Sequence, residues 1–197
     1  MKRCKQDGQP PVHWQNLFHL CSALLFLTLS ACAASTGYQA EDTQRLADAI
    51  RALGPGVDPG EADRAARISY SHARELAIAY EISDPPLVHN TKVNMGLKPR
   101  GLCWHWAEDM QKRLDAENFR TLDIHRAIAN ADNPLRIDHS TALISARDQP
   151  MQSGIVLDPW RNGGRLFWAR VPEDTRYDWQ PQSRILARRY GVTPVGE

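Results

Sequence analysis

Three residues, Cys103, His139 and Asp158, have the types and the order that cysteine-based amide chemistry requires. A cysteine attacks a carbonyl carbon as its thiolate, and it needs a nearby base and a third group that orients that base. His139 can act first as the base and then as the acid, while Asp158 holds its ring. These residues predict a Cys–His–Asp triad if the fold brings them together.

The pattern around Cys103 places this residue at the start of a helix. Apolar residues recur with helical spacing from Leu102 to Leu114, which predicts a helix over residues 101–117. The partial positive charge of the free N–H groups at a helix start favours a thiolate. Gly101 allows a tight turn into the helix and close approach of a substrate backbone. The backbone N–H of Cys103 is then placed to help bind an oxyanion.

His139 and Asp158 fall on two neighbouring predicted strands, residues 138–146 and 154–160. Antiparallel neighbours can place two such side chains opposite each other on one face. Asp138 is a poorer partner for His139, because successive strand residues point to opposite faces. His125, on the preceding predicted strand, is the alternative base if the register differs.

The elements that must position these residues follow a simple order, with helices first and strands later. Apolar periodicity predicts helices over residues 41–53 and 61–82, and residues 87–100, rich in Asn, Gly and Pro, form a connection to the Cys103 helix. After Asn118 the period changes to that of strands, and Asn162-Gly163-Gly164 is a turn signal. The chain therefore predicts an α+β fold with an antiparallel meander. The predicted strands are residues 120–129, 138–146, 154–160 and 165–171, followed by a short basic helix over 183–190.

Three stretches resemble the transglutaminase-like branch of the papain-like cysteine enzymes. They are Gly101-Leu102-Cys103-Trp104-His105-Trp106-Ala107, Asp138-His139-Ser140 and Val156-Leu157-Asp158-Pro159-Trp160. The pattern of that family is a Gly-x-Cys that opens a helix, a His on a strand and an Asp-Pro that ends the next strand. The resemblance covers roughly residues 87–171 and implies a papain/transglutaminase-like core. In such a core the helix bearing the Cys packs on an antiparallel sheet bearing His and Asp, here with preceding N-terminal helices in one domain over residues 41–197.

The resemblance also implies an activity. Cys103 would be the nucleophile, His139 the general base and acid, and Asp158 the residue that orients the imidazole. The enzyme would form a thioester and pass the acyl group to water or to an amine, without a cofactor. The substrate would be a peptide, a protein or a peptidoglycan-like amide. His89, Asn90 and Asn94, in the segment before the helix, are candidates for a second oxyanion donor.

The N-terminus has the pattern of an export signal. Basic residues at the start precede an apolar run over residues 20–29, which is too short to span a membrane. The run ends in Leu29-Ser30-Ala31-Cys32, which resembles the bacterial lipobox. We therefore expect a signal peptide over residues 1–31, lipidation of Cys32 and a tether over residues 32–40. Ala33 in place of Asp indicates the outer membrane, facing the periplasm, while a plain secretory signal cut near Ala31 or Ala34 is the alternative.

The cysteine count gives Cys103 a special place. Cys4 and Cys21 would leave with the signal and Cys32 would carry lipid, so Cys103 would be the single free thiol of the mature chain. Exported chains usually pair their cysteines or avoid them. A functional thiol explains this exception, and a buried inert cysteine is the alternative.

Composition excludes several other functions. The net charge of +1 offers no basic excess for nucleic acid, and no Gly-x-Gly-x-x-Gly or Gly-x-x-x-x-Gly-Lys pattern indicates a nucleotide site. A metal site built from Cys103, His105, His125 and His139 lacks the usual ligand spacing, so no metal is predicted. Two functions remain: an envelope cysteine hydrolase or acyl transferase, and a non-catalytic envelope lipoprotein that uses the same fold as a scaffold. Trp104, Trp106, Trp160 and Trp168 are candidates for a substrate groove, and Arg184, Arg188 and Arg189 form a basic run on a solvated face or against anionic lipid or polymer.

Overall fold

The computed structural model describes residues 40–191. The predicted signal peptide, Cys32 and the tether up to residue 39 lie outside these residues. From Thr43 onward the chain forms one compact unit. None of the helices in the described part has an apolar stretch long enough for a membrane crossing.

Most helices lie where the periodicity predicts them. The first runs over residues 40–51, and α2 (Pro59–Ala79) begins where the Asp58 side chain accepts a hydrogen bond of 2.9 Å from the Glu61 N–H. The helix α4 (Cys103–Asp115) begins at the predicted cysteine, and α5 (Gln182–Tyr190) matches the short basic helix.

One helix contradicts the prediction. The segment expected to be a plain connection contains α3 (Pro86–Asn94). Pro86 occupies the first turn, where its fixed φ suits a helix. Leu87 and Val88 are exposed and His89 is the only buried residue of α3, so this helix has no apolar stripe to reveal it.

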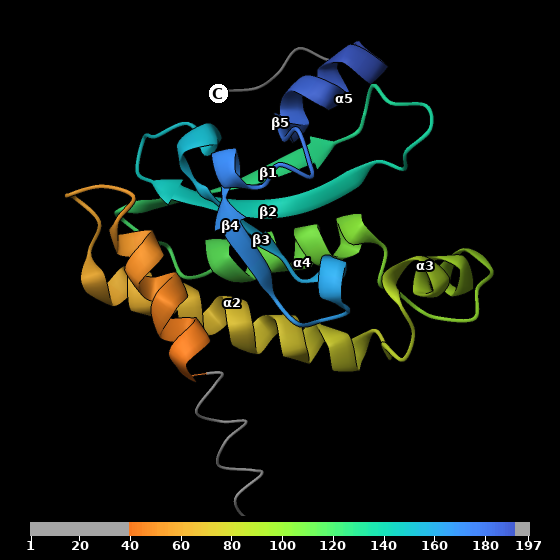
Figure 1. The fold of residues 1–197 in the computed structure, drawn as a ribbon, viewed down its shortest axis with the longest axis horizontal. Helices are drawn as coiled ribbons and strands as arrows, with labels where there is room; N and C mark the ends of the chain where they lie inside the picture. Colours follow the sequence, from red (N-terminus) through yellow and green to blue (C-terminus); the bar gives the residue numbers. More distant parts are fainter. Residues whose placement is uncertain (1–39, 192–197) are drawn as a thin grey trace, which may run out of the picture. The chain divides into compact units, whose positions relative to one another are not determined.

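The strands form one antiparallel sheet in the order β4-β3-β2-β1-β5 (Figure 1). The predicted meander is confirmed in β1 to β4, and Gly163 and Gly164, both with positive φ, lie in the connection from β3 to β4. β5 was not predicted, because two residues carry no pattern. The strands are β1 (Leu122–Ala129), β2 (His139–Ala146), β3 (Ile155–Asp158), β4 (Phe167–Arg170) and β5 (Gln180–Pro181).

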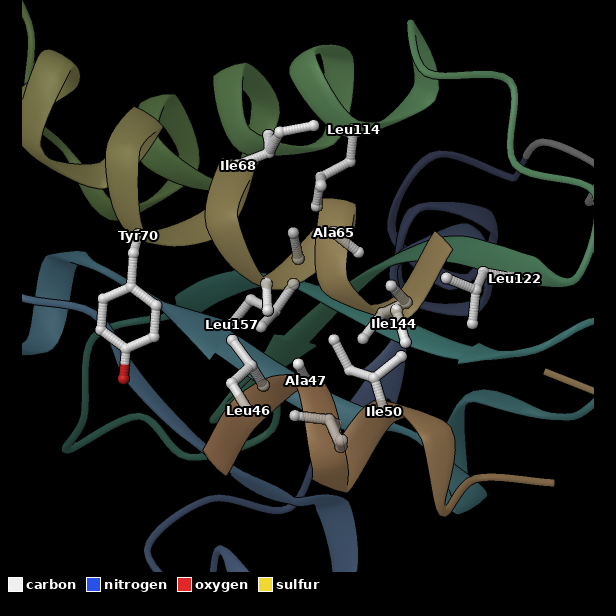
Figure 2. Close-up of a cluster of buried hydrophobic side chains, with 14 of the residues drawn as sticks. Leu46, Ala47, Ile50, Ala65, Ile68, Tyr70, Leu114, Leu122, Ile144 and Leu157 are labelled. Atoms are coloured by element: carbon white, nitrogen blue, oxygen red, sulfur yellow. The ribbon is translucent and has the colours of Figure 1, made fainter. Parts of the chain in front are cut away.

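The main core lies on the helix-covered face of the sheet. α4 packs against β1 and β2, and α2 packs against α4 (Figure 1). Leu46 and Ile50 of the first helix meet Ile68 of α2, Leu114 of α4 and Ile144 of β2 in a single apolar cluster (Figure 2). Burial of this cluster fixes the position of α4 on the sheet, and the α+β class is confirmed.

The opposite face of the sheet carries a second, smaller cluster. Leu143 of β2 and Val156 of β3 pair in register and pack with Trp179. Since side chains alternate along a strand, His139 and Thr141 share this face with Leu143, while Ser140 and Ala142 face the main core side. This alternation decides what His139 can reach.

Candidate active site

The start of α4 is held by two aromatic side chains of its own first turn. The Nδ1 atom of His105 accepts hydrogen bonds from the backbone N–H groups of Gly101, at 3.1 Å, and Leu102, at 3.2 Å. Nε1 of Trp106 donates to the backbone oxygen of Gly101 at 3.0 Å. Burial, followed by the charge of Arg100, lowers the pKa of His105, which keeps the ring neutral and Nδ1 an acceptor. His105 is itself buried, so it packs inside the fold.

A glycine is required at position 101 because the ring of His89 lies against it, a contact that the sequence did not predict. Its φ is +124°, and a Cβ at this position would lie 2.4 Å from Nε2 of His89. His89 is buried, and its Nε2 donates to the backbone oxygen of Arg100 at 2.9 Å. The close approach expected at Gly101 is thus made by an imidazole of the chain itself. Together these contacts fix where Cys103 begins the helix.

The structure brings His139 and Asp158 into direct contact. Nε2 of His139 lies 2.6 Å from Oδ2 of Asp158, and both side chains are 1% exposed. Continuing the register in which Ala142 pairs with Leu157 places Asp158 opposite Thr141. His139 and Asp158 are therefore diagonal neighbours on one face, not the directly opposite pair that the sequence suggested.

Cys103 lies against the first residues of β2. Its thiol donates to the backbone oxygen of Asp138 at 3.6 Å. Among the described residues, Cys103 is the free cysteine. Nδ1 of His139 is buried and has no hydrogen-bond partner among the described residues. Because Asp158 occupies Nε2, Nδ1 is the ring atom left for the thiol.

The electrostatics of His139 reflect both neighbours. Burial alone would lower its pKa, but the charge and hydrogen bond of Asp158, and then the nearby Cys103, raise the pKa of His139 to about 9. Burial would likewise raise the pKa of Asp158, yet His139 and Arg161 lower it. The pair is therefore held as imidazolium and carboxylate at neutral pH.

The Asp158 carboxylate is also held by a chain of buried charged residues, Arg161 and Asp174. Arg161 donates from its backbone N–H to Oδ1 of Asp158 at 3.1 Å and from Nε to Oδ2 at 3.0 Å. The other end of its guanidinium forms a bidentate pair with Asp174, at 3.0 and 2.7 Å, and Nε1 of Trp179 donates to the same carboxylate at 3.0 Å. Every charge in this buried chain has an opposite neighbour, which fixes the Asp158 carboxylate in one orientation.

Three aromatic rings enclose His139. The ring centroids of Trp160 and Tyr177 each lie 4.7 Å from the imidazole, and that of Trp179 lies 5.4 Å away. Trp160 is in turn held by its Nε1, which donates to Oδ1 of Asn90 at 3.1 Å. The rings limit the imidazole to one orientation and exclude water from its contact with Asp158.

Cys103 also lines an open cavity of about 540 Å³. The first turns of α4 form one wall, α5 forms another, and side chains of β1 and β2 lie between them. Trp104 on α4 and Tyr190 on α5 give this cavity aromatic surface, and Arg126, Glu108 and Asp138 give it charge. A substrate in the cavity would meet Cys103 from the side of α4 and the sheet.

The remaining candidates lie elsewhere. Asn90 accepts from Trp160, Asn94 is exposed at the end of α3, and His89 contacts Arg100. None of these three oxyanion candidates hydrogen-bonds to Cys103 in the part of the chain that the structure describes. His125, the alternative base, contacts Oγ of Ser145 at 2.8 Å, away from the start of β2.

Other residues predicted as candidates have structural roles. Within residues 40–191, no three His, Cys, Asp or Glu side chains gather as ligands for a metal ion. Trp104 lines the cavity, Trp106 is in the core, and Nε1 of Trp168 donates to the Tyr70 hydroxyl at 3.0 Å. In the basic run, Arg188 pairs with Asp132 and Arg189 with Asp138.

Several residues of the site were not predicted. Arg161 follows Asp158 by three residues, within one turn of chain, so its pairing with this carboxylate had a local signal. Asp174, Tyr177 and Trp179 come from the irregular segment between β4 and β5, which has no pattern that ties it to His139.

No family model, no curated protein and no solved structure matches this chain. It is an α+β protein in which the buried imidazole and carboxylate of His139 and Asp158 are paired near a helix-start cysteine, and that cysteine lines an open cavity.

Proposed function

We propose that the protein is a cysteine-dependent amide hydrolase or acyl transferase, with Cys103 as nucleophile, His139 as base and acid, and Asp158 as the orienting carboxylate. The observation that carries this proposal is the state of His139. Its Nε2 is bonded to Asp158 at 2.6 Å, while Nδ1 is buried without a partner among the described residues, beside the Cys103 thiol. Buried ring nitrogens are normally satisfied, so one left open towards a thiol suits proton transfer.

The chemistry follows from the positions of the protons. In the reactive state the proton of the Cys103 thiol resides on Nδ1 of His139, as part of the imidazolium, and the thiolate forms a C–S bond with the amide carbon. The C–N bond then breaks, and the amine leaves with the proton from Nδ1. Water or an acceptor amine next gives its proton to Nδ1 and attacks the thioester, which breaks the C–S bond and restores the thiol. The backbone N–H groups of Cys103 and Trp104, which have no backbone acceptor among the described residues, are available to the oxyanion.

The arrangement of elements supports a papain/transglutaminase-like core as part of this proposal. The cysteine opens α4, which packs on the sheet, while the histidine begins β2 and the aspartate ends β3. The N-terminal pattern adds a lipid anchor at Cys32 and an outer-membrane location facing the periplasm. Peptides and peptidoglycan-like amides are the substrates that such a location would offer.

Alkylation of Cys103 by iodoacetamide tests the proposal in the full chain, with the modified peptide quantified by mass spectrometry. At pH 6 the reaction of the thiol should depend on the neighbouring His139 ring. The alkylation rate should therefore fall about tenfold or more in His139→Ala, and by less in Asp158→Asn. His125→Ala is the matched control, because His125 contacts Ser145 and not the thiol.

The opposite outcome is equally clear. A thiol that reacts only after unfolding in urea, or at the same rate in all these variants, would make Cys103 a core residue. The scaffold lipoprotein would then be the better description.

A further inference from the structure

The cavity beside Cys103 contains a cationic side chain that has no ion-pair partner among residues 40–191. Arg126, on β1, lines this cavity, and no carboxylate of the described residues forms a salt bridge with it. Its guanidinium makes one long contact, from Nη2 to the backbone oxygen of Trp104 at 3.4 Å. Its Nε is buried and has no hydrogen-bond partner in that same part of the chain.

The acidic residues of the cavity are neutralised by other cations. Glu108 pairs with Lys112 at 2.9 Å and with Arg100 at 3.5 Å. Asp138 pairs with Arg189 of α5. Among the described charges of this cavity, the positive charge of Arg126 is therefore the one left unbalanced.

An arrangement of this kind is costly for the free protein. Burial lowers the pKa of Arg126 below its ordinary value, against the opposing charges of Glu108, Cys103 and Asp109. A desolvated guanidinium without a counter-ion destabilises a fold, and its forked N–H groups match a carboxylate in bidentate geometry. A ligand that supplies this carboxylate would offset the destabilisation caused by the unpaired guanidinium.

The position of Arg126 shows which part of a ligand it would meet. The strand register pairs Arg126 with Ala142 and Ile128 with Ser140, so Arg126 shares the cavity face with Ser140. Its guanidinium reaches the oxygen of Trp104, the residue that follows the nucleophile. A carboxylate held there would lie close to the bond that Cys103 attacks.

We infer that Arg126 is a binding residue for a substrate carboxylate, so that the protein selects amides with an acidic group next to the scissile bond. This inference rests on the proposed function, because it takes Cys103 as the nucleophile. The acidic group can be the side chain of an Asp or Glu residue or a free α-carboxylate.

Two alkylating reagents of nearly equal size test this site without any turnover. Iodoacetate carries a carboxylate and iodoacetamide a neutral amide, and both react with the Cys103 thiol of the full chain. The ratio of their rate constants cancels any change in the thiol itself, since such a change affects both reagents. Arg126→Gln should lower the iodoacetate-to-iodoacetamide ratio about tenfold, whereas Arg126→Lys should retain part of it.

Arg120→Gln is the matched control, because Arg120 is exposed and precedes β1 at its far end. Its ratio should equal that of the natural chain. An unchanged iodoacetate-to-iodoacetamide ratio in Arg126→Gln would overturn the inference. Any effect of Arg126 would then be on the reactivity of the thiol and not on binding of a carboxylate.

A protection experiment distinguishes the two sources of the carboxylate. N-acetylglutamate α-amide presents a side-chain carboxylate, N-acetylglutamine presents an α-carboxylate, and N-acetylglutamine amide presents neither. At least one of the two acids should slow iodoacetamide labelling in the natural chain more than in Arg126→Gln, and the acid that does so names the source. Equal protection by all three compounds would count against the site.

Stability provides an independent readout. Because Arg126 has no ion-pair partner to lose among the described residues, and only a long contact with the Trp104 oxygen, Arg126→Gln should unfold in urea at the same midpoint as the natural chain or a higher one. A merely structural arginine would show the reverse. If His139→Ala leaves alkylation unchanged while the reagent ratio still depends on Arg126, the triad fails and the carboxylate site stands.

Discussion

At the scale of single residues, two glycines before α4 differ in their surroundings although both have positive φ. Gly96 has a φ of +73° and open space at its Cβ position, whereas a Cβ at Gly101 would meet the His89 ring at 2.4 Å. Gly96→Ala should therefore cost about 1 kcal/mol of unfolding free energy from backbone strain alone. Gly101→Ala should cost about 3 kcal/mol or more, because a steric clash adds to the strain.

Urea unfolding of the two variants measures this difference. The double variant His89→Ala/Gly101→Ala should recover part of the loss relative to the sum of the single changes, since removal of the ring relieves the clash. Equal costs at Gly96 and Gly101, with no coupling to His89, would show that His89 does not constrain the start of α4.

The individual residues also show how far sequence reasoning reaches. Cys103, His139 and Asp158 could be selected because each has a chemically distinctive type and lies at a recognisable point of a helix or strand. Arg126 and Asp174 could not be selected, because surface arginines and aspartates are common. Their importance depends on which charges the fold leaves unpaired or buried.

At the scale of elements, α5 closes one side of the cavity. Ile185 is fully buried and anchors this helix, while Leu186 faces the cavity and is 38% exposed. Ile185→Ala should lower the unfolding free energy by about 2–4 kcal/mol, whereas Leu186→Ala should cost less than about 1 kcal/mol. Urea unfolding measures both.

The same two variants separate packing from access. In Ile185→Ala the loosened wall should let a bulky maleimide label Cys103 faster, and in Leu186→Ala the wall should stay in place. If Ile185→Ala unfolds no earlier than Leu186→Ala, then α5 is held by its ion pairs with Asp132 and Asp138 and not by its apolar anchor.

Elements with a regular spacing of apolar residues were predictable. Elements that are stabilised only by contacts with distant parts of the chain were not. α4 and β2 have complete apolar patterns, because both are covered on faces that the core defines. α3 presents exposed Leu87 and Val88 and a buried histidine, so its pattern contradicts its structure. β5 exists because it pairs with Ala127 and Ile128 of β1, and no property of Gln180–Pro181 alone indicates a strand.

At the scale of the whole molecule, the buried His139–Asp158 pair links stability to pH. Because the pKa of His139 rises on folding from its ordinary 6.5 to about 9, the folded state binds this proton more tightly than the unfolded state. The stabilisation is full below about pH 6.5 and is lost as the pH rises through 9. A pKa change of this size corresponds to on the order of 3 kcal/mol. The lowered pKa of Asp158 acts at the other end, since its contribution is lost as the pH falls below the ordinary range of a carboxyl group.

Urea unfolding of the natural chain and of His139→Gln, from pH 5 to pH 10, isolates the first effect. The difference between their unfolding free energies should shrink steadily between pH 6.5 and pH 10, because glutamine does not titrate. Parallel curves across this range would mean that His139 has the same proton affinity in the folded and unfolded states. The predicted ion pair between His139 and Asp158 would then be wrong.

The alternation of side chains along β2 has a consequence for how this protein can change over generations. His139 shares one face of the sheet with Thr141 and Leu143, whereas Ser140 lies on the cavity face together with Ile128 and Arg126. A substitution at a cavity position alters what binds without touching the packing of the imidazole and its carboxylate. Under the proposed function, selectivity and reactivity are therefore separately mutable, so that a substitution on the cavity face can change the substrate while the proposed chemistry stays intact.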